Sequence, residues 1–99
     1  MLNAAEDRLD LNQIVDPAIL RKALNAIAAR LGGASTEARQ AVLAEVKRVN
    51  SLGRETARTM LFDDGGGTAC AVRISHLQDV ITAALYDYAS QHVYRVENP

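Results

Sequence analysis

Two side chains in the last third of the chain have the types and spacing that acid–base or metal chemistry uses. His76 and Asp79 are three residues apart, so on a helix they share one face. A histidine beside a carboxylate can relay a proton or hold a metal ion. Because neither a nucleophile nor a third ligand accompanies them, the pattern favours an ordinary surface pair or a contact to a partner.

The sequence contains one cysteine, Cys70, so an internal disulfide is excluded. No second cysteine and no suitably spaced histidine accompanies it, which argues against a metal site. A single thiol on an apolar helix face packs as a small hydrophobic group. We therefore expect Cys70 to belong to the core.

The segment from Asp63 to Thr68 (DDGGGT) has two features of ion-binding loops. Glycines before a helix can cradle a phosphate, and carboxylates can bind calcium. However, no Gly-Lys-Ser/Thr follows the glycines, the adjacent aspartates repel anions, and the longer ligand series of a calcium loop is missing. The segment predicts a plain turn.

Four basic residues project within about 100° of one another if the helix that carries them is regular. They are Arg39, Lys47, Arg54 and Arg58. Such a basic face can meet a phosphate or an acidic partner, or it can be a solvated surface relieved by acids such as Glu55. No catalytic, metal-binding or cofactor-binding set is predicted anywhere in the sequence.

The composition limits the class of protein. Ninety-nine residues allow one small domain. Hydrophobic residues make up 48% with aromatics at 4%, which favours helices packed through aliphatic side chains. The net charge of −1 argues against nucleic-acid binding. The first ten residues lack the apolar core of a signal peptide, and no apolar run reaches the ~18 residues of a membrane span, so we expect a cytoplasmic protein.

The last third predicts a long amphipathic helix, about 68–94, with Thr68 as its N-cap. Its apolar stripe is formed by residues at steps of three and four: Cys70, Ile74, Leu77, Ile81, Ala84, Leu85 and Tyr88, extended by His92.

Further apolar residues lie away from this stripe. Val72, Tyr86 and Val93 fall roughly opposite, and Val80 and Tyr94 fall on its flanks. Scattered exposed apolar residues are normal on protein surfaces. Alternatively, this side of the helix, together with His76 and Asp79, contacts another subunit or a domain that follows in a longer chain.

A shorter helix is predicted over about 17–31. Asp16 can cap its amides, Pro17 suits its first position, and Gly32 suits its end. Its apolar positions are Leu20, Leu24, Ile27 and Leu31.

Another long helix is predicted over about 36–62, opened by Ser35 or Thr36. Its shared face carries Val42, Val46, Val49 and Met60, with Ala38, Gly53 and Thr56 on or beside it. Gly53 costs about 1 kcal/mol relative to alanine. It either permits a close approach by a neighbour or marks a kink or break.

These elements predict an all-α fold. The short connection between the helices at 36–62 and 68–94 makes them an antiparallel hairpin, with the helix at 17–31 packed beside them. Residues 1–16 form an extended or frayed lead-in, in which Leu9 to Val15 lies against the helices, and 17–99 form a single module.

The amino-acid sequences of several segments resemble those of one bacterial enzyme family. These segments are Gly66–Ala71, Arg73–Asp79, Leu85–Tyr86, Val93–Arg95 and Asn98–Pro99, with Asp16–Ala18 at the first helix. They are similar to the N-terminal helical region of the bifunctional PII uridylyltransferase/uridylyl-removing enzyme, of alphaproteobacterial type. The specific part of the likeness covers Gly66 to Pro99.

The resemblance implies a function that the chain itself does not carry. Such enzymes transfer UMP from UTP to a tyrosine of the PII protein when glutamine is scarce, and remove it when glutamine is abundant, in nitrogen regulation. They need Mg²⁺ or Mn²⁺. The Gly-Gly-x-Gly-Arg and Ser-Asp-x-Asp motifs of the nucleotidyltransferase domain are absent here, so no catalytic residue carries over.

Two hypotheses follow from the sequence. In the first, the module is the N-terminal part of such an enzyme, packs against its transferase domain and is inactive alone. In the second, it is a freestanding helical interaction module or homodimeric adaptor without catalysis.

Overall fold

Helices account for nearly all of residues 10–64 and 67–94, the part of the chain that the computed structural model describes, and this part contains no strand. The elements are α2 (Leu11–Ile14), α3 (Pro17–Leu31), α4 (Thr36–Asp64), α5 (Gly67–Tyr88) and the π-helix η1 (Ala89–Val93). The all-α prediction is confirmed. The predicted frayed N-terminus (1–9), the glycines 65 and 66, the side chains of the two aspartates before them, and the C-terminal tail (95–99) lie outside the described residues.

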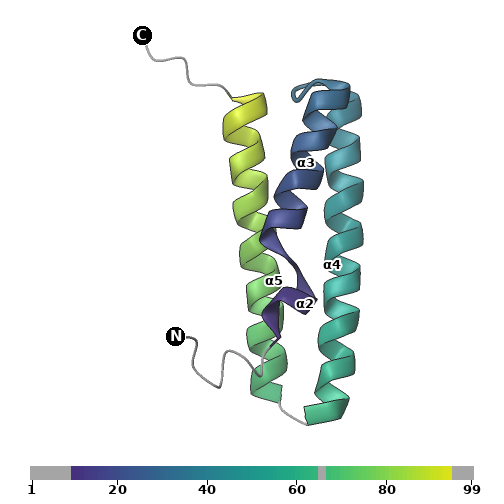
Figure 1. Cartoon of the computed structure of the whole chain (residues 1–99), viewed down its shortest axis with the longest axis vertical. Coiled ribbons are helices and arrows are strands. Elements are labelled where there is room, and N and C mark those ends of the chain that lie inside the picture. The colour runs from purple at the N-terminus through teal and green to yellow at the C-terminus, as the bar shows by residue number, and fades with distance from the viewer. Residues whose placement is uncertain (1–9, 65–66, 95–99) are drawn as a thin grey trace.

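The two long helices α4 and α5 run antiparallel along the length of the molecule, as predicted (Figure 1). α3 packs against both of them over one half of their length, and α2 packs against both nearer the opposite end. Together α2 and α3 form a broken third rod. The chain therefore runs up, down and up, and η1 lies at the same end as the α3–α4 turn (Figure 1).

The boundaries of α3 coincide with the predicted ones because both of its end signals are local. Asp16 Oδ1 accepts hydrogen bonds from the backbone N–H groups of Ala18, at 2.9 Å, and Ile19, at 3.3 Å. At the other end Gly32 adopts a φ of 78°, which favours glycine, and its N–H donates to Ala28 O.

The lead-in is not simply extended. Leu11–Ile14 forms one helical turn, and only Val15, with φ −161° and ψ 137°, is in the extended region. Ile14 and Val15 are 4% and 6% exposed. One helical turn places Ile14 in the core with its carbonyl oxygen beside Gly53 of α4, whereas the sequence pattern predicts an extended segment.

The core follows the predicted stripes with two exchanges. Leu31, expected in the core, is 36% exposed, and Ala28 is buried in its place. On α4, Ala57 is fully buried beside the expected positions. The buried hydrophobic residues are Ile14, Val15, Leu20, Leu24, Ile27, Ala28, Ala38, Val42, Ala57, Leu77, Ala84 and Tyr88.

Gly53 lies inside an unbroken α4 and permits a close approach by two other elements. A Cβ at this position would lie 2.8 Å from Leu77 Cδ1 and 3.0 Å from the Ile14 carbonyl oxygen. Both distances are shorter than ordinary van der Waals contact. Of the sequence alternatives, the close approach is therefore correct.

We predict that Gly53→Ala lowers stability, although alanine is the better helix former. The gain in helix propensity of about 1 kcal/mol is outweighed by overpacking, which typically costs about 1–3 kcal/mol. Thermal unfolding followed by circular dichroism measures the effect. Gly67→Ala is the matched control, since a Cβ there meets nothing within 4 Å. An unchanged or raised melting temperature for Gly53→Ala contradicts the prediction.

We also predict that Leu77→Asp unfolds the chain and that Ile81→Asp destabilises it less. Leu77 is 0% exposed, whereas Ile81 is only partly buried against the core. An unpaired carboxylate in the core costs several kcal/mol, comparable with the whole stability of a small domain. Helical circular dichroism measures the loss, and Gln78→Asp, at an exposed position of the same helix, controls for the added charge. Retained cooperative melting in Leu77→Asp would disprove the assignment of this core.

Candidate functional site

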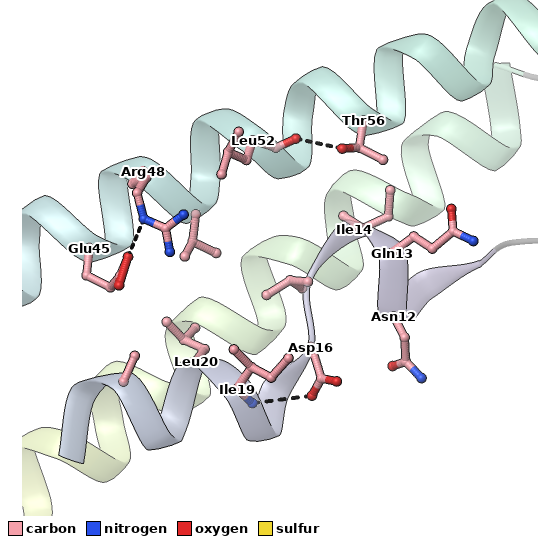
Figure 2. A pocket seen from close by; sticks show the side chains of 13 residues that line it. Asn12, Gln13, Ile14, Asp16, Ile19, Leu20, Glu45, Arg48, Leu52 and Thr56 are labelled. Atoms are coloured by element: carbon pink, nitrogen blue, oxygen red, sulfur yellow. Dashed lines mark hydrogen bonds and ion pairs between the residues drawn. The ribbon is translucent and has the colours of Figure 1, made fainter. Parts of the chain in front are cut away.

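A hollow of the surface lies between the α2–α3 elbow and α4 (Figure 2). It has a volume of about 390 Å³. Asn12, Gln13 and Asp16 contribute polar groups from the elbow side, and Figure 2 shows Glu45, Arg48 and Leu52 arranged along α4 on the other side. The elbow exists because α2 ends at Ile14 and α3 restarts at Pro17, which leaves an extended step between them.

Exposed aliphatic side chains border this hollow. Ile19 is 68% exposed and Leu52 is 55% exposed, and both line it. The hollow continues towards the α3–α4 turn, where a second hollow is lined mainly by small residues, Ala23, Ala26, Ala41 and Ala44. The two hollows share Ala23, Glu45 and Arg48, so they form one groove along α3 and α4, called the α3–α4 groove below.

An ion pair stands in the middle of the α3–α4 groove. Arg48 Nε donates to Glu45 Oε1 at 2.6 Å. This hydrogen bond, together with the charge of the carboxylate, raises the pKa of Arg48 above its ordinary value. The α3–α4 groove therefore has an ion pair at its centre.

The outer side of α5 carries several of the predicted contact residues. Val72, Tyr86 and Tyr94 are 40%, 71% and 70% exposed, and Asp79 is also exposed. Val80 and Val93 differ from them, because both are partly buried and pack against the core. The outer side of α5 therefore consists of Val72, Asp79, Tyr86 and Tyr94.

His76 and Asp79 do not form the hydrogen-bonded pair that their spacing suggests. The Nε2 atom of His76 is buried and has no hydrogen-bond partner among the described residues. His76 is half-buried while Asp79 is exposed, so the two side chains point into different surroundings. Within residues 10–64 and 67–94, no group of three His, Cys, Asp or Glu residues is placed to hold a metal ion.

The four residues of the basic face remain on the surface of α4. Arg39, Lys47 and Arg58 are exposed, and Arg54 is half-buried. Arg54 Nε donates to Asn50 Oδ1 at 3.3 Å, and Arg58 pairs with Glu55 at 3.5 Å. These partners are neighbours on the same helix, so they offset part of the positive charge of the basic face.

Sequence reasoning missed Arg73, a charged residue buried in the described part of the chain, at 2% exposed. The signal was present, since Arg73 lies four residues before Leu77 and three after Cys70, on the edge of the apolar stripe. A long basic side chain at such a position is usually assumed to reach solvent.

A set of side-chain contacts fixes the end of α5 against the α3–α4 turn. Tyr88 Oη donates to Gly33 O at 2.9 Å, and His92 Nε2 lies 3.1 Å from Asn25 Oδ1. The rings of Tyr88 and His92 lie 4.9 Å apart between centroids. A Cβ on Gly33 would collide with His92.

Because of these contacts, the last helix differs from the prediction. The α-helix ends at Tyr88 instead of about residue 94, and residues 89–93 continue as the π-helix η1. A π-turn widens the helix and lets His92 lie against Gly33, a tertiary requirement that helical periodicity does not contain.

No protein-family model matches this chain, and no solved structure gives a significant match to it. In the described residues, no helix is long and apolar enough to cross a lipid bilayer.

We predict that Tyr88→Phe loosens the end of α5. The substitution removes the hydrogen bond to Gly33 O and leaves a partly buried carbonyl without that donor, which costs about 1 kcal/mol. Thermal melting and amide hydrogen exchange across 85–94 measure the effect, with Tyr86→Phe as the control on an exposed tyrosine. Equal protection in the two variants would show that the Tyr88 hydroxyl does not stabilise this end.

Proposed function

We propose that this module is the N-terminal helical portion of a PII uridylyltransferase/uridylyl-removing enzyme. It packs against the transferase domain of that enzyme and has no activity alone. The sequence segments that resemble the family fall mainly on α5, including Arg73–Asp79 and Leu85–Tyr86. The observation that carries the proposal is the exposed apolar surface on the outer side of α5.

The arrangement of that side suits contact with another domain. Val72 and Tyr86 are fourteen residues apart, which brings them within about 40° on the helix. Tyr94 follows eight residues after Tyr86, just beyond η1. An exposed tyrosine supplies apolar area and a hydroxyl at small cost in side-chain entropy, which is why tyrosine is common in interfaces. These three residues would contact the transferase domain, with Asp79 between Val72 and Tyr86 on the same side of the helix.

In this proposal the chemistry belongs to segments outside this sequence. UMP transfer from UTP with Mg²⁺ or Mn²⁺ would use the family's Gly-Gly-x-Gly-Arg and Ser-Asp-x-Asp motifs, and this sequence contains neither of them. The contribution of the module is structural: the contacts of Tyr88 and His92 hold the end of α5 in one position, from which the chain leads on.

The alternative is a freestanding helical interaction module or homodimeric adaptor without catalysis. The α3–α4 groove favours it, since Ile19 and Leu52 expose large aliphatic groups beside a hollow on a surface distinct from the outer side of α5.

The deciding experiment determines the intact mass of the native gene product and assays it for UMP transfer. We expect a product several times larger that transfers labelled UMP from UTP to PII protein with Mg²⁺, while residues 1–99 alone transfer none. In the large product, Tyr86→Asp should lower activity and melting temperature together because it charges a buried contact. Ala29→Asp, at an exposed position of α3, is the control.

Two results contradict the proposal. A native product of about this size removes the enzyme hypothesis and leaves the adaptor. A large product that transfers UMP normally with Tyr86→Asp shows that α5 does not contact the transferase domain.

A further inference from the structure

We propose that the α3–α4 groove binds a second copy of this chain, with α3 and α4 of each copy running antiparallel to their counterparts about a twofold axis. The groove is complementary to itself in both charge and shape under that one operation. The inference does not depend on the proposed enzyme, because it uses a different surface from the outer side of α5.

The central ion pair sets the position of the axis. Glu45 and Arg48 lie at the middle of the groove, since both hollows include them. An axis that passes between them places Arg48 opposite Glu45 of the partner copy. The four side chains then form a square of alternating charges. The Glu45–Arg48 pair of 2.6 Å within each copy is kept, and each of its side chains gains an oppositely charged partner in the other copy.

The same axis matches the two ends of α4. Leu52 lies four residues after Arg48, and Ala41 lies four residues before Glu45. An antiparallel copy therefore places the exposed Leu52 over Ala41 of the partner copy. A large aliphatic group meets a small one, as close packing of helices requires.

The same twofold axis also pairs complementary residues along α3. Ala23 is the α3 residue shared by both hollows, so it lies near the axis. Asp16 lies seven residues before Ala23 and Arg30 lies seven after it, and both line the groove. The axis therefore brings Asp16 opposite Arg30 of the partner copy, a second pair of opposite sign. Ile19, four residues before Ala23, faces Ile27 of the partner copy, which lines the groove four residues after it.

The size of the surface sets the strength of the association. Asp16 to Arg30 spans about 21 Å of helix, and two adjacent helices are about 20 Å wide. These dimensions cover about half of the roughly 800 Å² per partner of a standard specific interface. We therefore expect a reversible dimer whose population depends on concentration.

The decisive test is a charge exchange measured by sedimentation over a concentration series. Glu45→Arg carries two positive charges on the axis and Arg48→Glu carries two negative charges, so each variant alone repels its own copy. We expect each to associate at least about tenfold more weakly than the parent, because like charges at an interface are strongly unfavourable. An equimolar mixture should associate within about threefold of the parent.

Two controls separate the interface from folding and from other surfaces. Helical circular dichroism and melting show that each variant is folded, since the changed pair is also a contact within α4. Tyr86→Ser, on the outer side of α5, should leave the association unchanged.

A crosslink tests the register of the axis. In a Cys70→Ala background, Ala23→Cys should form a disulfide-linked dimer under mild oxidation, because the two copies meet at this residue. Ala29→Cys, on another side of α3, should crosslink much less.

Three results overturn the inference. The first is a parent chain that stays monomeric over the whole series, in which case the groove serves a different partner or none. The second is a mixture of the charge variants that associates no better than each variant alone. The third is equal crosslinking through positions 23 and 29.

Discussion

At Gly53 the absence of a side chain lets α2, α4 and α5 meet at one point, and the arrangement of the other elements depends on that contact. The methyl groups of Leu77 and the carbonyl oxygen of Ile14 occupy the space that a Cβ would need. Because Leu77 is 0% exposed, this closest approach lies inside the core and not at its edge. A larger residue would push α5 away from α4. Because the interior is close-packed, such a shift would also loosen the α4–α5 contacts on either side of position 53.

The parts of the fold that the sequence predicts are those with local causes. Asp16, Pro17 and Gly32 define α3 because capping, the fixed proline φ and a positive φ act within a few residues. The parts it does not predict depend on distant contacts. Leu11–Ile14 is helical because of what it covers, and the π-helix follows from the fit of His92 against Gly33.

The candidate site likewise has parts that the sequence predicts and parts that depend on distant contacts. The exposure of Val72, Tyr86 and Tyr94 follows from helical periodicity, which places them away from the core stripe. Periodicity also places Val80 and Val93 outside it, yet both pack against the core, because a third rod beside α4 and α5 widens the buried part of each helix. The α3–α4 groove was not predictable, since it depends on the elbow between α2 and α3 and on the register of two helices.

Every helix of the bundle contributes to the core, including the last one, and this bears on biosynthesis. Leu77, Ala84 and Tyr88 all come from α5, the last of the long helices to leave the ribosome. Leu24 of α3 and Val42 of α4 belong to the same core cluster as these α5 residues. Until α5 has been synthesised, the apolar stripes of α3 and α4 are therefore not fully covered. Folding then completes quickly, because α4 and α5 are neighbours in sequence and their pairing closes only a short loop.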